Sequence, residues 1–361
     1  MKYVDEYRQK RHINRLADLI RQSSKGEYTF MEVCGGHTAA IHRFGIPSLL
    51  PPEIRLISGP GCPVCVTAAR YIDTLVALAF RDGMTVALFG DLMRVPGTVM
   101  SPGAAKASGA DVRVVLSAHE ALDLARSDPQ RNIVFAAIGF ETTAPGTAVT
   151  LIQAEREGID NFFVLSAHKV MPPAMEAILK DGTEIDGFIC PGHVAVITGS
   201  SAFSFIPERH GLACVVTGFE PTDILSAVLM LVRQVNSHSP GVEIQYSRAV
   251  SVEGNARAQA YMYEVFEPCD VEWRGIGQIP SGGLQIRERF RRFDAAAAFP
   301  VDLPEPAGSN ACICGEILRG ISIPTDCPLF ASACTPDHPE GACMVSEEGS
   351  CNTYYKYRHH E

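Results

Sequence analysis

The chain has 361 residues, 46% apolar and 20% charged, and its apolar runs fall far short of the ~20 residues that span a bilayer. Its 31 Lys and Arg against 41 Asp and Glu give a net charge of -10, which opposes non-specific attraction to nucleic acid. We therefore expect two domains, or two and an appendage, with neither membrane nor nucleic acid as a partner. The first twenty residues lack the features of a secretory signal, so we expect a cytoplasmic protein.

Short apolar, β-branched runs alternate with segments of helical period from Thr29 to about Val216. This alternation predicts an α/β fold with mostly parallel, buried strands, and ligands at their carboxyl ends. The predicted strands are, in chain order, residues 29–33, 54–58, 85–89, 112–117, 133–138, 162–166, 187–190 and 213–217.

The sequence SDPQR, residues 127–131, interrupts this pattern. We place a boundary there, between a first α/β lobe over residues 30–128 and a second over 129–238. A third region then combines residues 1–29 with 239–361 and ends in a Cys-rich, loop-rich tail. The interruption is equally compatible with an ordinary loop within one larger sheet.

The motif MEVCGGHT places Cys34 just past a predicted strand and His37 at the start of the following helix. A sulfur and an imidazole three residues apart suit a borderline transition metal, and a helix N-terminus favours the thiolate form of cysteine. One Cys and one His make an incomplete site, which a partner or ligand would complete. A purely structural Cys34 is the alternative.

The motif GPGCPVC places Cys62 and Cys65 at another strand-to-helix junction. We expect at least one of these thiols to be acidic and reactive, and the pair to cycle between dithiol and disulfide. A metal site would require two further ligands, and a structural role is the remaining alternative.

The motif GFETTAPG contributes an acid directly after an apolar strand, which makes Glu141 a candidate for proton handling or for positioning a metal-bound ligand. His193, in PGHVAVITG, follows a strand in the same way, but we favour a structural role for it.

The last fifty residues hold a concentration of cysteines interleaved with Pro, Gly and Thr. Thiolates are the usual ligands of iron–sulfur clusters and of structural zinc, and either would hold together a segment with few periodic apolar residues. Paired CxxC knuckles of a zinc ribbon are absent, so we favour a cluster. Spacing does not identify the four ligands among the six cysteines, which are Cys312, Cys314, Cys327, Cys334, Cys343 and Cys351.

Four signatures together resemble the HypD family of hydrogenase maturation scaffold proteins: MEVCGGHT, GPGCPVC, GFETTAPG and the cysteine pattern of the tail. The resemblance covers nearly the whole chain. It implies two α/β lobes and a third region made from the chain's ends, with the N-terminal helix, around Asp5 to Arg21, packed with the tail. It also implies a [4Fe-4S] cluster whose ligands are Cys312, Cys327, Cys334 and Cys351, leaving Cys314 and Cys343 as a second redox pair or as alternative ligands.

The resemblance further implies that Cys34, with His37 beside it, holds a transient Fe(CN)2CO iron centre jointly with a small HypC-type chaperone. Cys62 and Cys65 would relay electrons for the release of cyanide from a HypE-type donor, and the hydrogenase large-subunit precursor would be reached indirectly. The alternatives are a free-standing iron–sulfur disulfide reductase and a zinc-stapled interaction module.

Overall fold

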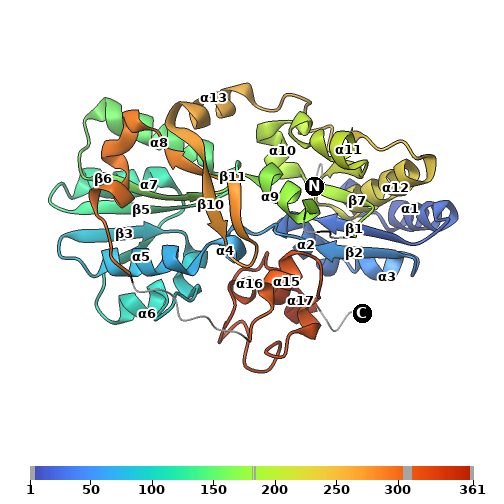
Figure 1. Ribbon diagram of the computed structural model, residues 1–361, viewed down its shortest axis with the longest axis horizontal. Coiled ribbons are helices and arrows are strands. Elements are labelled where there is room, and N and C mark those ends of the chain that lie inside the picture. Colours follow the sequence, from blue (N-terminus) through green and yellow to red (C-terminus); the bar gives the residue numbers. More distant parts are fainter. Residues whose placement is uncertain (1–4, 181, 183, 304–310, 358–361) are drawn as a thin grey trace.

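Two parallel sheets form the body of the computed structural model, which describes residues 5–180, 182, 184–303 and 311–357. They lie on opposite sides of the molecule in Figure 1, with the C-terminal tail below and between them. The α/β fold with mostly parallel strands is confirmed. Sheet A has the order β2 (Ile54–Ser58), β1 (Tyr28–Glu32), β7 (Gly187–Pro191), β8 (Ala213–Thr217), β9 (Val242–Ile244), and sheet B has the order β4 (Val112–Val114), β3 (Met84–Leu88), β5 (Asn132–Gly139), β6 (Phe162–His168).

The strands do not divide between the sheets at residues 128 and 129, where we placed the lobe boundary. Strand β1 pairs with β7, while β3 pairs with β5, so residues 30–128 contribute to both sheets. The chain crosses to sheet B after β2 and returns to sheet A after β6. Local sequence does not show this crossing, because buried strands of either sheet have the same apolar composition.

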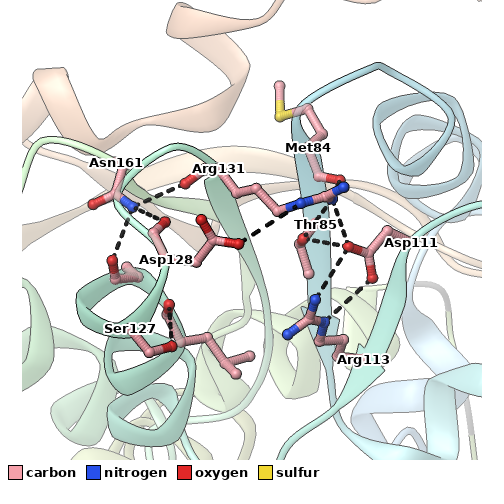
Figure 2. A network of polar contacts seen from close by, with 10 residues as sticks. Met84, Thr85, Asp111, Arg113, Ser127, Asp128, Arg131 and Asn161 are labelled. Atoms are coloured by element: carbon pink, nitrogen blue, oxygen red, sulfur yellow. Dashed lines mark hydrogen bonds and ion pairs between the residues drawn. The ribbon is translucent and has the colours of Figure 1, made fainter.

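The SDPQR segment is a loop of sheet B, held by the polar network in Figure 2. The guanidinium of Arg131 donates to the Asp111 carboxylate at 2.7 Å, and Thr85 Oγ1 donates to the same group at 2.7 Å. The Asn161 amide donates to the carbonyls of Ala125, Asp128 and Arg131. These bonds tie the loop to three strands of one sheet, so it is a turn within that sheet.

Alternate residues of the buried strands point to opposite faces, and each face is covered by helices. In β5, Ile133 and Phe135 pack with α7 and α8, whereas Val134 and Ala136 pack with α5. Figure 1 shows α7 and α8 above sheet B and α5 and α6 below it. The bounds of these helices are α5 (Ala69–Ala79), α6 (Pro102–Ala107), α7 (Ala118–Ser127) and α8 (Ala144–Glu157).

The N-terminal helix α1 (Lys10–Ser23) packs against α12 (Pro221–Ser237) beside sheet A, so its predicted packing against the tail is wrong. Ile20 is fully buried in a cluster with α12 side chains, and the Asn236 amide donates to the carbonyl of Ser23 at 2.8 Å. Only four residues, 24–27, separate α1 from β1, so the short link keeps the apolar face of α1 on sheet A. Other elements near sheet A are α2 (Gly35–Arg43), α3 (Ile46–Leu49), α9 (Met171–Lys180), α10 (Gly192–Thr198), η3 (Ser200–Phe203) and α11 (Phe205–His210).

An antiparallel hairpin, β10 (Phe266–Trp273) and β11 (Gly277–Ile286), runs between sheet A and sheet B (Figure 1). Near its tip, the Arg274 amide donates to the carbonyl of Val66 at 2.9 Å. A Cβ on Gly275 would lie 2.7 Å from Gly315 Cα, so hairpin and tail are in close backbone contact. The hairpin therefore connects the CPVC segment with the tail.

The tail contains only short helices, and within the described part of the chain no helix is long and apolar enough to cross a membrane. The buried apolar side chains of the tail share one cluster with residues of both sheets. The remaining elements are η1 (Asp5–Tyr7), α4 (Pro63–Val66), η2 (Gly90–Arg94), α13 (Ala256–Val265), η4 (Glu288–Phe293), α14 (Ala295–Ala298), α15 (Cys314–Leu318), η5 (Pro324–Asp326), α16 (Ala342–Val345) and α17 (Ser350–Tyr357).

Candidate functional site

The loops that follow β1 and β2 lie against each other at the carboxyl edge of sheet A. The Gly35 amide donates to the carbonyl of Gly61 at 2.9 Å, and the Gly59 amide donates to the carbonyl of Glu32 at 2.7 Å. A Cβ on Gly61 would lie 2.3 Å from the backbone nitrogen of Cys34, so only glycine fits there. The structure thus places CGGHT and GPGCPVC side by side.

Cys34 precedes α2 and is partly exposed. Its pKa is raised to about 12, first because the thiol is withdrawn from water, and then because of the negative charge of Glu348, with a smaller contribution from Glu32. We expected the helix N-terminus to lower the pKa of Cys34, and that expectation is wrong for this structure. Desolvation and neighbouring carboxylates outweigh the partial positive charge of a helix of nine residues.

Glu32 lies beneath Cys34 and is 2% exposed. Its carboxylate accepts hydrogen bonds from the Cys34 amide at 3.0 Å and from Thr38 Oγ1, and burial raises its pKa to about 7. We did not single out Glu32 from the sequence. The signal was an acid within an apolar strand, the same kind of signal that drew attention to Glu141.

His37 is fully buried and is held in one orientation. Its Nε2 donates to the carbonyl of Gly218 at 3.0 Å, and burial lowers its pKa to about 4, so the ring is neutral at pH 7. The ring stacks on Phe219 with centroids 4.5 Å apart, and Phe219 stacks on His193 at 4.0 Å. Gly36 separates Phe219 from Cys34 Sγ, so this aromatic stack forms one wall of the Cys34 site.

His193, which we expected to be structural, is exposed and stands at the outer end of that stack. Its proximity to the motif around Cys34 depends on Phe219, which sequence analysis did not identify.

Cys62 and Cys65 are free thiols that are 3% and 1% exposed. Burial raises the pKa of Cys65 well above its ordinary value, so the expectation of an acidic thiol is wrong for Cys65 in this state. Helix α4 is a single turn, and its N-terminus does not compensate for the loss of hydration.

A chain of thiol contacts leads from the CPVC segment into the tail. The thiol of Cys65 lies close enough to Cys343 for the two to influence each other's pKa, and the Sγ atoms of Cys343 and Cys314 are 2.8 Å apart. Cys314 and Cys312 likewise influence each other's pKa, and both line the same pocket. Sequence analysis left Cys314 and Cys343 without a defined place, and the structure puts them between the CPVC pair and the other tail cysteines.

All six tail cysteines line one small pocket, together with apolar side chains. Within the described ranges, no group of three or more Cys, His, Asp or Glu side chains is arranged to hold one metal ion. The residues of the pocket are Cys312, Cys314, Ile317, Cys327, Leu329, Phe330, Cys334, Gly341, Cys343, Met344 and Cys351.

Glu141 follows the carboxyl end of β5 in the other sheet and is 1% exposed. Its Oε1 accepts a hydrogen bond from the Met171 amide at 3.0 Å, Oε2 has no hydrogen-bond partner, and burial raises its pKa to about 7. The preceding Phe140 lies in the same apolar cluster as Cys62 and Cys65. Glu141 therefore follows a strand of sheet B and is not part of the loop pair at Cys34, which follows β1 and β2 of sheet A.

Comparison with known proteins agrees with these signatures. A family model named HypD, described as the hydrogenase formation hypA family, matches residues 10–358. The chain is 47% identical to hydrogenase maturation factor HypD2 of Bradyrhizobium diazoefficiens, in an alignment covering 100% of this chain and 99% of the relative. It is 46% identical to hydrogenase maturation factor HypD of Cupriavidus necator, covering 99% of this chain and 97% of the relative. Identity to hydrogenase maturation factor HypD of Azotobacter vinelandii is 47%, with the same coverage of 99% and 97%.

Fold and site define a class of two-lobed α/β proteins in which a thiol-rich tail adjoins paired Cys loops. Within that class, the chain belongs to the HypD family. The resemblance drawn from its four signatures is confirmed.

Proposed function

We propose that this protein is a hydrogenase maturation factor that acts as scaffold and redox factor in assembling the Fe(CN)2CO unit of [NiFe]-hydrogenase. The names of its relatives support the maturation role. The observation that carries the finer proposal is the chain of thiol contacts from the six-cysteine pocket through Cys343 to Cys65, next to the loop of Cys34.

The tail pocket fits a [4Fe-4S] cluster held by Cys312, Cys327, Cys334 and Cys351. Its lining is thiol and apolar, and thiolates are the usual ligands of iron–sulfur clusters. When bound, such a cluster supplies electrons singly. The protein contributes the four thiolates and the apolar shell that keeps water out.

The Cys62 and Cys65 thiols are the proposed reductant of thiocyanate on a HypE-type donor. The S–CN bond breaks, and cyanide leaves for the iron with the electron pair. The two cysteines form a disulfide and give up two protons, one to the donor's sulfur and the other to solvent. Restoring the dithiol takes two electrons, delivered one at a time by a low-potential reductant, and two protons from solvent. Contact with Cys65 makes the pair Cys314 and Cys343 the proposed intermediate carrier.

Iron is the cargo of the proposed Cys34 site. Cys34 is partly exposed, which suits joint binding with the cysteine of a HypC-type chaperone, and the Glu32 carboxylate holds its amide in place. The neutral His37 and its stack with Phe219 fix the wall behind the thiol. The hydrogenase large-subunit precursor would receive the finished unit from the chaperone.

The alternative function is a free-standing iron–sulfur disulfide reductase. The near-complete burial of Cys62 and Cys65 disfavours reaction with diffusible disulfides and favours a partner that opens the site. Fast partner-independent turnover of a small disulfide would support this alternative.

The test is the Cys34→Ala variant in anaerobically purified complex with a HypC-type partner, observed by infrared spectroscopy. We expect the cyanide bands to disappear while iron and acid-labile sulfide of the tail remain at about four each per chain. Undiminished cyanide bands would overturn the iron site, and zinc without sulfide would overturn the redox role.

A further inference from the structure

One tail residue reaches the Cys34 loop directly. A Cβ on Gly35, the residue after Cys34, would lie 2.5 Å from Glu348 Cβ, 2.7 Å from its backbone oxygen and 3.1 Å from its Oε2. Glu348 therefore rests on the first turn of α2, where only glycine leaves room for it. Its exposure leaves the side chain accessible from solvent.

The tail fixes Glu348 in this position through its neighbours. The Glu348 amide donates to Ser346 Oγ at 3.2 Å, and the Gly349 amide donates to the carbonyl of Ser346 at 2.9 Å. A Cβ on Gly349 would lie 2.2 Å from the carbonyl oxygen of Cys343, so this turn is pressed against a pocket cysteine. Helix α17 also packs on α2, with the rings of Tyr354 and His42 4.4 Å apart.

The Cys34 loop thus lies between two carboxylates that come from distant parts of the sequence. Glu32 is buried beneath the Cys34 loop and accepts a hydrogen bond from the Cys34 amide. Glu348 packs on the outer side of the same loop and is exposed. Partial burial of the Glu348 carboxyl, and then the negative charge of Asp91, raise its pKa above the ordinary value. Lys356 of α17 pairs with the neighbouring Glu347.

We propose that Glu348 is a positioning residue of the iron site, through which the tail supplies a negative charge that retains iron at Cys34. The inference rests on the proposed function and adds to it: the iron site is complete only when the tail is folded against α2. An incoming Fe²⁺ meets the Cys34 sulfur between two carboxylates, so that its charge is balanced before cyanide is delivered.

The Glu348→Gln variant isolates the charge, because glutamine keeps the Cβ and backbone contacts with Gly35. Removing a residue that supports a metal site from outside its ligand shell typically weakens metal binding by 10-fold to 100-fold. We therefore expect Glu348→Gln to retain about tenfold less iron–cyanide unit, with partial recovery in Glu348→Asp. The matched control is Glu347→Gln, whose side chain is 80% exposed and pairs with Lys356.

The experiment compares full-length protein, purified anaerobically with a HypC-type partner, in wild-type, Glu348→Gln, Glu348→Asp, Glu347→Gln and Cys34→Ala forms. Infrared cyanide bands per chain measure the retained unit, and acid-labile sulfide reports on the tail. Loss of the bands in Glu348→Gln at unchanged sulfide, with a shifted cyanide frequency in the residual signal, supports the charge role, because a purely structural defect would leave that frequency unchanged.

Two outcomes overturn the inference. Bands of wild-type intensity in Glu348→Gln, when Cys34→Ala has none, would show that Glu348 does not retain iron. Loss of sulfide together with the bands would show that Glu348 serves the tail's structure. If Cys34→Ala itself keeps the bands, the proposed iron site is wrong, independently of Glu348.

Discussion

The buried carboxyl of Glu141 predicts a specific dependence of stability on pH. Burial raises its pKa from the ordinary 4.5 to about 7. The folded protein therefore binds this proton more tightly than the unfolded chain, so Glu141 costs no stability below about pH 4.5. The cost grows as the pH rises and levels off above about pH 7.

The size of this cost follows from the two pKa values. At about 1.36 kcal/mol for each pKa unit, the difference between 4.5 and about 7 corresponds to about 3 kcal/mol. Glu141→Gln removes the charge and keeps an oxygen that accepts the Met171 amide. We expect the variant to match the wild type near pH 4.5 and to be more stable by up to about 3 kcal/mol at pH 8.

Urea unfolding midpoints of wild type, Glu141→Gln and the exposed-residue control Glu253→Gln, measured between pH 4.5 and pH 8.5, test this. The difference in urea midpoint between wild type and Glu141→Gln should increase as the pH rises across that range. The midpoint of the exposed control Glu253→Gln should follow that of the wild type at every pH. A constant difference between wild type and Glu141→Gln would refute the reasoning, since it would mean that Glu141 does not gain a proton on folding.

Three further outcomes are expected. Gly61→Ala should lower the melting temperature by several degrees, because the added Cβ overpacks against Cys34 at a cost of about 1–3 kcal/mol. The control Gly26→Ala should leave the melting temperature unchanged, because no atom lies within 4 Å of its Cβ position. Circular dichroism measures both melting temperatures. Asp111→Asn should cost about 1 kcal/mol by weakening the network of Figure 2; an unchanged urea midpoint would contradict this. Cys62→Ser should abolish cyanide delivery while the chaperone still binds in pull-down, and normal hydrogenase maturation in such a strain would exclude an obligatory relay.

The sequence was sufficient for the first eight strands, but not for their pairing and not for β9 or the hairpin of β10 and β11. Each predicted strand corresponds to an observed one, because apolar, β-branched runs between turns identify buried strands locally. Which strands pair depends on contacts between residues far apart, such as Met31 with Phe188, and local pattern does not encode these. The N-terminal helix was misplaced for the same reason.

The candidate site, too, was predicted from local sequence only in part. Motifs identified Cys34, His37, Cys62 and Cys65, since turn glycines and strand ends mark functional loops. Sequence analysis missed residues whose role depends on tertiary contact, namely Phe219 against His37 and Glu348 against Gly35. The direction of the thiol pKa shifts also depends on burial, which helix-end reasoning ignores.

The enclosure of the CPVC segment has a consequence for protein synthesis. Cys65 is covered by Cys343 and by the hairpin contact to Val66, and these residues leave the ribosome roughly 200 to 280 residues after it. At about 5–20 residues per second, the nascent pair stays open to the cell for tens of seconds. During that interval, oxidants and metal ions have access to thiols that the finished fold almost completely covers.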